Sequence, residues 1–367
     1  MRHAAILPSV LAFATLLLAR TPAYAWSWWA LRFISIDMLP VAVLLGLLGA
    51  ATSARVGRTR FAALGLFAAL SSALLLAPLA QTLADDHVSI SLVRWVGGGQ
   101  SAPVPFQADV PIGHDLLVDV YGQPGDAPKP CVIVIHGGSW ARGDKGEGVA
   151  ASRALANAGA IVVDLRYRLA PAHPFPAGLH DVLYALAAVR SGVIPGVDPA
   201  RVTFLGRSAG GHLALLAGAG ANRADLSPPD LGPQAPPAAV VALYPPVDLA
   251  WSWNHLMDPD LTDTHNTLTD FVGGGLDKVP ALYNLASPNM IAGADAPPTL
   301  VLFGQAEQVV SPAQAAFVAQ AWQAAGRPVE TGALPLFDHG LDARRGSVGG
   351  QWAEARTLRF LRANGAL

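Results

Sequence analysis

The stretch Gly206-Arg207-Ser208-Ala209-Gly210-Gly211 is the strongest structural signal in this sequence. It follows the short apolar run 202–205, and the Ala/Leu-rich run 212–219 that comes after it is typical of a helix. A G-x-S-x-G pattern is meaningful in this setting, between a strand and a helix. The glycines permit a sharp turn that lifts the Ser208 hydroxyl clear of a sheet, so Ser208 is a candidate nucleophile. The alternative is a chance turn in a glycine-rich chain.

Apolar runs alternate with helical patterns on both sides of this turn. We expect strands at 116–121, 131–135, 160–165, 202–205, 238–243, 299–303 and 329–334, and helices at 147–158, 178–191, 312–325 and 350–362. Strands separated by helices predict an α/β fold with a mostly parallel central sheet and helices on both faces. Residues 248–297 break the alternation, which suggests a lid or insertion over the site.

The composition is unevenly distributed along the chain. Of the 367 residues, 52% are hydrophobic and only 14% are charged, which is more apolar than an ordinary soluble domain. The excess lies in residues 1–84, whose formal charge is +5, whereas residues 85–367 carry −7. A mildly acidic second part without a basic stripe gives no support for nucleic-acid binding. The one cysteine, Cys131, lies in an apolar run and is expected to be a buried strand thiol.

Three apolar stretches, 4–19, 33–54 and 61–83, predict an N-terminal membrane segment over residues 1–84. The last two are long enough to cross a hydrocarbon core of about 30 Å. The first is followed by an A-x-A pattern at 23–25, so it is either a cleavable signal peptide or a first span. A buried helical hairpin in a soluble protein is the alternative for the whole segment.

Three arginines between the second and third stretches, Arg55, Arg58 and Arg60, set the expected orientation. Arginines mark the cytoplasmic side of a membrane, so this loop should face inward. The third stretch then leads outward. The sequence therefore predicts that residues 85–367 form a catalytic domain outside the cytoplasm.

A glycine turn at 136–140, His-Gly-Gly-Ser-Trp, follows the expected strand 131–135. Glycines at this point let backbone N–H groups approach a reacting carbonyl oxygen. Together with the N–H of Ala209, those of Gly137, Gly138 and Ser139 are candidates for an oxyanion hole. An ordinary Gly-Gly turn after a strand is the alternative.

A serine nucleophile also needs a base and an acid, and both have candidates late in the chain. His339 follows a strand-like stretch and precedes a glycine, and it comes after the acid position in the order that this chemistry uses. Glu307 follows the expected strand 299–303 through a glycine turn. Asp248, Asp338 and Asp342 are rival acids. We see no metal-ligand spacing and expect no cofactor.

From about residue 102 to its end, the chain resembles the α/β-hydrolase superfamily. It is most similar to hormone-sensitive-lipase-like carboxylesterases and to arylformamidase-like enzymes. The resemblance rests on residues 136–140, on Tyr167-Arg168-Leu169-Ala170-Pro171 with His173-Pro174-Phe175-Pro176, on residues 206–211, and on His339-Gly340. It implies Ser208 as nucleophile, Glu307 as acid and His339 as base, with oxyanion donors on Gly138, Ser139 and Ala209.

Three residues depart from the pattern of these enzymes. Ser139 replaces the third glycine after the histidine, Arg207 stands where aspartate is often found, and Glu307 replaces an aspartate. The last change leaves the triad workable, since either acid can orient an imidazole.

The sequence thus predicts a membrane-anchored serine carboxylesterase that cleaves a small-molecule or lipid-like ester through an acyl-enzyme intermediate. Amide, peptide or arylformamide hydrolysis by the same groups is an alternative. A non-catalytic binding module on a hydrolase fold is another, and the ordered Ser, Glu and His argue against it.

Overall fold

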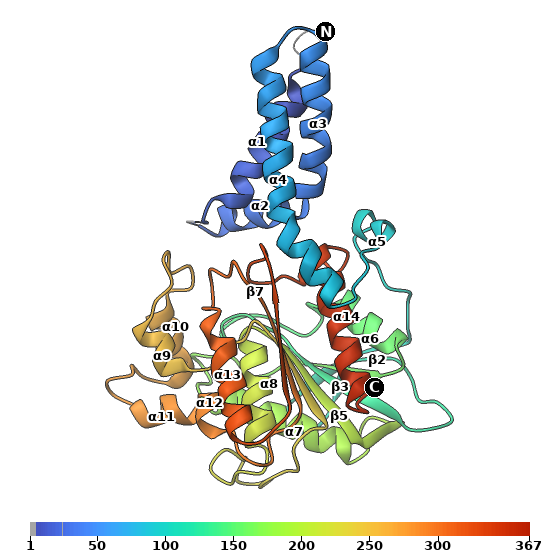
Figure 1. Cartoon of the computed structure of the whole chain (residues 1–367). Coiled ribbons are helices and arrows are strands. Elements are labelled where there is room, and N and C mark those ends of the chain that lie inside the picture. Colours follow the sequence, from blue (N-terminus) through green and yellow to red (C-terminus); the bar gives the residue numbers. More distant parts are fainter. Residues whose placement is uncertain (1–4, 24) are drawn as a thin grey trace. The chain divides into compact units, whose positions relative to one another are not determined.

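The computed structural model describes residues 5–23 and 25–367, and it divides into two compact units (Figure 1). The N-terminal unit comprises the chain up to Ile90 with two short segments, Gly304–Gln308 and Leu334–Asp338. All other residues form the sheet unit. Ala4, which begins the first predicted apolar stretch, and Tyr24, the middle residue of the A-x-A pattern, lie outside the described residues.

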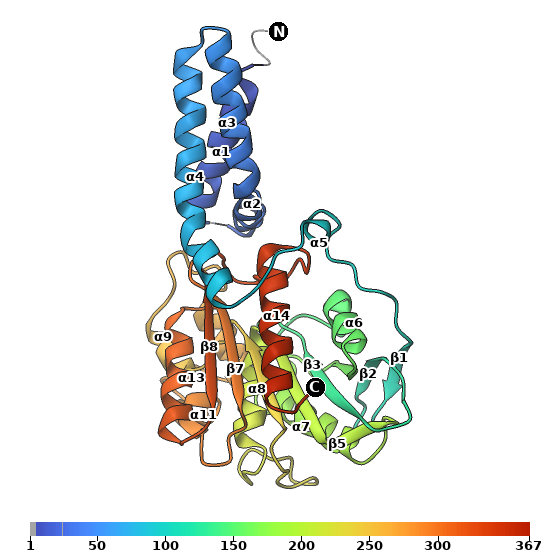
Figure 2. The same cartoon turned by 45° about the vertical axis from the view of Figure 1, so that its right-hand side comes forward.

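The N-terminal unit is helical: α1 is Leu7–Arg20, α2 Trp26–Asp37, α3 Leu39–Arg55 and α4 Thr59–Asp85. Helices α1, α3 and α4 lie side by side (Figures 1 and 2) and approach closely through small residues. A Cβ atom on Gly46 would lie 2.6 Å from the carbonyl oxygen of Gly65, and one on Gly49 would lie 2.3 Å from the hydroxyl of Ser9. Close contact through Gly, Ala and Ser is typical of helices that pack in a membrane.

Among the described residues, α4 is the one unbroken helix long and apolar enough to cross a membrane, and it contains the predicted span 61–83. The predicted span 33–54 falls on two helices, because the chain bends by 65° between α2 and α3, and the two together are long and apolar enough for one span. Pro40 lies in the first turn of α3, where its missing N–H costs nothing. Farther inside a continuous helix, the same ring would clash with the preceding turn.

The sheet unit is built on an eight-stranded sheet. Its strands are β1 Phe106–Pro111, β2 Leu117–Tyr121, β3 Lys129–Ile135, β4 Ile161–Leu165, β5 Val197–Arg207, β6 Ala239–Leu243, β7 Thr299–Gly304 and β8 Val329–Leu334. The order is β1-β2-β4-β3-β5-β6-β7-β8. The pairs β1/β2 and β2/β4 are antiparallel, whereas β3 pairs in parallel with β4 and β5, and β6 with β5 and β7. The predicted mostly parallel sheet is confirmed.

Helices cover both faces of this sheet, as predicted. Helices α7 (Ala177–Arg190), α8 (Ala209–Gly220) and α13 (Ala313–Ala324) share one core, which includes Phe204 of β5. Leu205, the next residue along β5, faces the opposite side, toward α6 (Val149–Asn157) and α14 (Val348–Ala363), which is labelled in Figure 2. The expected strand thiol of Cys131 is buried.

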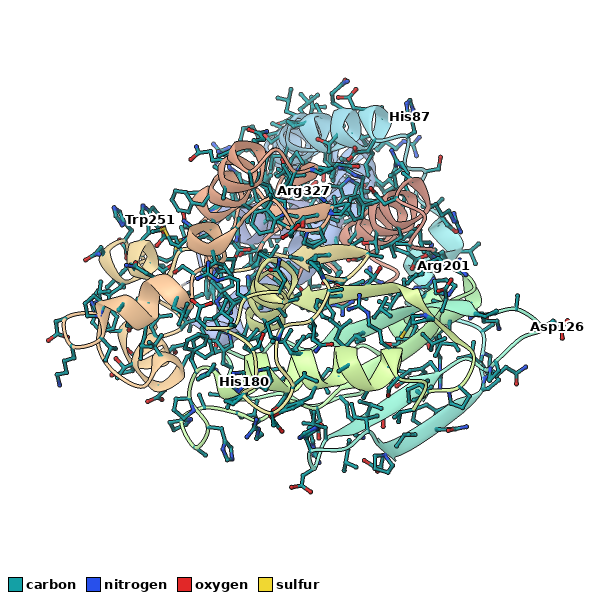
Figure 3. The ribbon with its side chains drawn as sticks, turned by 90° about the horizontal axis from the view of Figure 1, so that it is seen from below. His87, Asp126, His180, Arg201, Trp251 and Arg327 are labelled. Carbon is teal, nitrogen blue, oxygen red and sulfur yellow. The ribbon has the colours of Figure 1, made fainter. Side chains whose placement is uncertain are left out.

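The parallel strands place their carboxyl ends, and the loops that follow, at one edge of the sheet. Residues 136–140 follow β3, Ser208 follows β5 and Tyr244 follows β6. The predicted insertion, 248–297, contains four short helices: α9 Leu249–Asn254, α10 Thr264–Val272, α11 Pro280–Leu285 and α12 Pro288–Ile291. Trp251 marks this segment in Figure 3. One further short helix, α5 (Leu92–Val96), precedes β1.

Candidate active site

Ser208 occupies a strained turn between β5 and α8. Its φ of 52° and ψ of −121° are rare for a residue with a side chain. A Cβ atom on Gly206 would lie 2.1 Å from the carbonyl oxygen of Gly210, and one on Gly210 would lie 2.2 Å from that of Ile135. Only glycine fits at these two positions, so the sequence pattern and the sharp turn require each other.

The structure brings Ser208 and His339 together. The Nε2 atom of His339 lies 2.9 Å from the Oγ atom of Ser208, although the two residues are 131 positions apart. The imidazole is mostly buried, with 9% of the residue exposed. At this distance a neutral imidazole that carries its proton on Nδ1 can accept the hydroxyl proton.

Glu307 is buried, in the loop that follows β7. This loop is fixed by backbone hydrogen bonds from Gln305 N to Leu334 O and from Ala306 N to Phe337 O, both 3.0 Å long. The segment Leu334–Asp338 that accepts these bonds leads directly into His339. The loop of the candidate acid is thereby held beside the chain that enters the candidate base.

Two of the rival acids, Asp248 and Asp338, form hydrogen bonds elsewhere in the structure. Asp248 caps α9 by accepting a hydrogen bond of 2.8 Å from the N–H of Trp251. Asp338, within the N-terminal unit, accepts a hydrogen bond of 2.8 Å from the N–H of Gln308 and forms an ion pair with Arg32. Each carboxylate thus has a structural partner outside the candidate triad.

The loop after β3 lies against the nucleophile turn. A Cβ atom on Gly137 would lie 3.3 Å from the Cβ of Ser208. The next three residues have positive φ angles: 109° at Gly138, 53° at Ser139 and 57° at Trp140. Successive residues of this kind can turn backbone N–H groups into one concavity, as an anion site requires. The N–H of Ala209, at the first position of α8, is also outside the helical ladder.

Trp140 is held by a buried histidine that sequence reasoning missed. Its indole N–H donates to Nδ1 of His212 over 3.2 Å, and Nε2 of His212 donates to the carbonyl oxygen of Ala286 over 2.7 Å. Burial lowers the pKa of His212 to about 4, so the imidazole is neutral and can serve both partners. The Trp140 ring also stacks on Phe271 of α10, with centroids 4.2 Å apart.

The stretch 167–176, which has no chemistry of its own, supports the same loop. Tyr167 stacks on His136 with ring centroids 4.2 Å apart. The N–H of Ala170 donates to the carbonyl oxygen of Trp140 over 2.9 Å. Arg168 forms an ion pair with the buried Asp181 instead of facing the pocket. The sequence marked this stretch as a motif, but it did not show that the stretch contacts the loop 136–140, which lies about 30 positions earlier.

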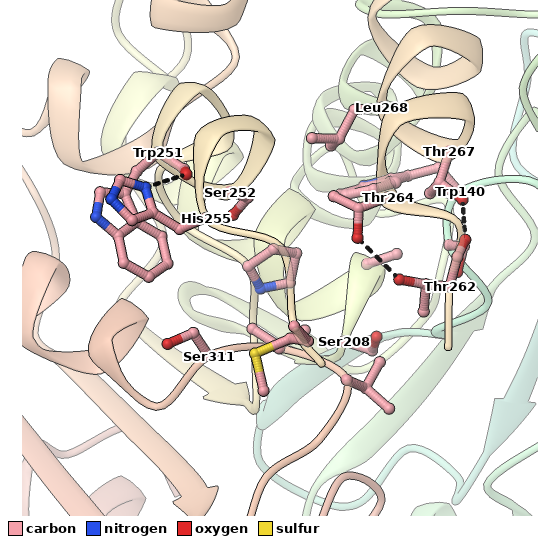
Figure 4. Close-up of a pocket in the computed structure, with 16 residues that line it drawn as sticks. Trp140, Ser208, Trp251, Ser252, His255, Thr262, Thr264, Thr267, Leu268 and Ser311 are labelled. Atoms are coloured by element: carbon pink, nitrogen blue, oxygen red, sulfur yellow. Dashed lines mark hydrogen bonds between the residues drawn. The ribbon is translucent and has the colours of Figure 1, made fainter. Parts of the chain in front are cut away.

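An open pocket lies over the nucleophile (Figure 4). Ser139, Ser208 and Ala209 contribute to its lining. Much of the wall comes from the 248–297 segment, through Trp251, Ser252, His255, Met257, Thr262, Thr264, Thr267 and Leu268. The wall therefore combines stacked aromatic rings with threonine hydroxyls. Across the described residues, no group of three or more His, Cys, Asp or Glu side chains could hold a metal ion.

The sheet, the strained serine turn and the order of the site loops define an α/β-hydrolase fold. Esterase B from Lactobacillus rhamnosis is a solved structure of similar fold, with a TM-score of 0.61 at 22% identity. The match covers 80% of this chain and 94% of that one.

The BD-FAE family model matches residues 118–322, which is more than half of the chain. The chain belongs to this family. Esterase LipQ of Mycobacterium tuberculosis is 30% identical over 250 residues, covering 66% of this chain and 58% of LipQ. An acetyl-hydrolase of Streptomyces hygroscopicus is 33% identical over 244 residues, covering 64% of this chain and 75% of its own. The chain thus spans little more than half the length of LipQ.

Proposed function

We propose that this protein is a membrane-anchored serine carboxylesterase. The observation that carries the proposal is the 2.9 Å approach of His339 Nε2 to Ser208 Oγ, at the base of an open pocket. The names of the relatives, an esterase and an acetyl-hydrolase, support ester bonds as the target. The buried Glu307 and the loop 136–140 supply candidates for the remaining roles.

In the proposed reaction, Ser208 Oγ attacks the ester carbonyl carbon while His339 takes the hydroxyl proton. The tetrahedral oxyanion is stabilised by backbone N–H groups of Gly138, Ser139 and Ala209, with Gly137 beside them. The C–O bond then breaks, and the alcohol leaves with the proton from His339. Water, deprotonated by His339, attacks the acyl-enzyme and releases the carboxylic acid. Glu307 holds the imidazole in the required tautomer.

A panel of p-nitrophenyl esters from acetyl to dodecanoyl tests this proposal, with Ser208→Ala as the control. We expect turnover by the wild type, none above background by Ser208→Ala, and a preference that locates the acyl length that the pocket accepts. Matched p-nitroanilides, peptides and an N-formyl arylamine test the alternative substrates. Faster turnover of any of these than of every ester would overturn the assignment to carboxylic esters.

The proposed anchor is the N-terminal unit, with the catalytic part outside the cytoplasm. Helix α4 is long and apolar enough to span, and the exposed Arg55, Arg58 and Arg60 lie at the junction of α3 and α4. Such an anchor would bring the enzyme to esters that partition into membranes. Alkaline phosphatase joined after Asp86 should be active, and joined at Arg58 it should be inactive. The reverse pattern would refute the orientation.

A further inference from the structure

Asp342 joins the residue before the nucleophile to an aromatic ring beside the base. Its Oδ2 atom accepts a hydrogen bond of 2.6 Å from Nε of Arg207. Its Oδ1 atom accepts a second, also 2.6 Å long, from the hydroxyl of Tyr244. Arg207 directly precedes Ser208, and Asp342 follows His339 by three positions. One carboxylate thus ties together the end of β5 and the loops that follow β6 and β8.

Tyr244 carries this connection to the imidazole. Its ring packs against that of His339, with centroids 4.5 Å apart and planes inclined by 60°. The backbone of Tyr244 has a φ of 42°, which is costly for an aromatic residue and persists only when its surroundings fix it. Its N–H donates to Leu302 O over 2.6 Å, and Ser208 N donates to Leu243 O over 2.9 Å. The tyrosine is therefore held on both sides of its peptide bond.

The charges in this cluster are largely shielded from water. The side chain of Asp342 is 8% exposed and that of Arg207 is 20% exposed. Burial alone would lower the pKa of Arg207, but the nearby Asp342 carboxylate outweighs it and the pKa is raised. Arg207 thus stays charged. Removing one partner of such a pair leaves the other charge poorly compensated, and the loops that carry them are free to shift.

We propose that Asp342, with Arg207 and Tyr244, is a positioning residue that sets the His339 imidazole at its distance from Ser208. This proposal rests on the proposed function. None of the three residues is assigned contact with substrate. Their effect is exerted through the base, where a displacement of about 1 Å can cost roughly 100-fold in rate. The network also gives Arg207 a role that an aspartate at the same position could not fill.

Two variants test the proposal, one by removing a single hydroxyl group and the other by removing a charge. Tyr244→Phe removes only the hydroxyl that binds Asp342 and leaves the ring on His339, so it should fold. Asp342→Asn removes the charge at nearly constant shape. We expect kcat to fall about 3- to 10-fold in the first and 10- to 100-fold in the second, with KM within about 3-fold of the wild type. The double variant should lose less than the product of the two, because both changes weaken the same contact between Asp342 and Tyr244.

The controls separate positioning from stability and from the proposed function. Tyr184→Phe and Asp230→Asn break a comparable tyrosine–aspartate hydrogen bond on the surface, and kcat should not change. All rates are divided by the concentration of active sites titrated with a fluorophosphonate probe, so unfolded protein does not count.

Arg207→Lys should retain more kcat than Arg207→Met. Wild-type kcat per titrated site in Tyr244→Phe and Asp342→Asn would overturn the proposal, even if both melt at lower temperature. Absence of probe labelling in the wild type would instead refute the function itself.

Discussion

The indole N–H of Trp140 donates to Nδ1 of His212 across 3.2 Å, which ties the loop after β3 to the helix that begins beside Ser208. Both residues are almost completely buried. Three successive residues in that loop have positive φ angles, and Trp140 is the last of the three. The His212 side chain therefore holds the loop of the candidate oxyanion hole in place through Trp140.

Replacing His212 by leucine should impair catalysis more than binding. The substitution leaves the indole N–H of Trp140 buried without an acceptor, which costs about 1–3 kcal/mol of stability. It also frees the loop that carries Gly138 and Ser139. We expect kcat to fall roughly 10- to 100-fold, the scale of a weakened oxyanion hole, with a small change in KM. His180→Leu, at a half-buried position of α7, is the control and should retain wild-type kcat. Unchanged kcat in His212→Leu would contradict this role.

Two buried groups should give the protein opposing pH dependences of stability. Burial lowers the pKa of His212 to about 4, so below about pH 6.5 the unfolded state binds a proton that the folded state does not. This contribution to stability is lost as the pH falls from about 6.5 to 4. Burial raises the pKa of Asp164 to about 6, despite the N–H of Gly146 and the charge of Arg207. In this case the folded state binds the extra proton, and stability is lost as the pH rises from about 4 to 6.

Asp164→Asn removes the pH dependence of stability that comes from Asp164 and leaves that of His212. We expect the variant to be more stable than the wild type by about 2–3 kcal/mol at pH 7.5, because it buries no carboxylate. At pH 4 the two proteins should be equally stable. Urea unfolding followed by circular dichroism across pH 4–7.5 measures the difference. A difference that does not change with pH would contradict the burial argument.

Glu307 is predicted to be the acid that orients His339. Glu307→Gln should reduce kcat by up to about 10⁴, the scale found when a triad acid loses its charge and keeps its shape. Asp248→Asn should retain much of its activity, because that carboxylate caps α9. Asp338→Asn should as well, although it leaves Arg32 without its ion pair. Near-wild-type turnover in Glu307→Gln, together with a large loss in either aspartate variant, would show that the acid is misassigned.

Helix α1 is predicted to remain in the mature protein. Its Ser9 meets α3 at Gly49 and α4 at Gly65, where added Cβ atoms would lie 2.3 Å and 2.6 Å from the serine hydroxyl. Cleavage after the A-x-A pattern would leave this small-residue surface of α3 and α4 uncovered. An epitope tag placed before Leu7 should stay on the membrane-bound, full-length band. Loss of the tag from that band would show that the helix is a signal peptide.

The local parts of this structure were predictable from sequence. Short apolar runs bounded by turn residues, such as 299–303, are typical of buried strands, and Ser208 is marked by glycines that its turn requires sterically. The bend before α3 was not predicted, because the apolar stretch 33–54 continues across it. The contacts of Asp342 with Arg207 and Tyr244 were not predicted either, since they join residues 135 and 98 positions apart. No periodicity or spacing in the sequence indicates either contact, and none indicates the contact between Trp140 and His212.

Covalent labelling of Ser208 tests most directly whether this residue is the nucleophile. Full-length protein in detergent is treated with a fluorophosphonate probe, and the modified peptide is identified by mass spectrometry. We expect a single adduct on Ser208 in the wild type, no adduct in Ser208→Ala, and a fall in kcat of roughly 10⁶ in that variant. Labelling that persists in Ser208→Ala, or ester turnover that survives the substitution, would contradict the account.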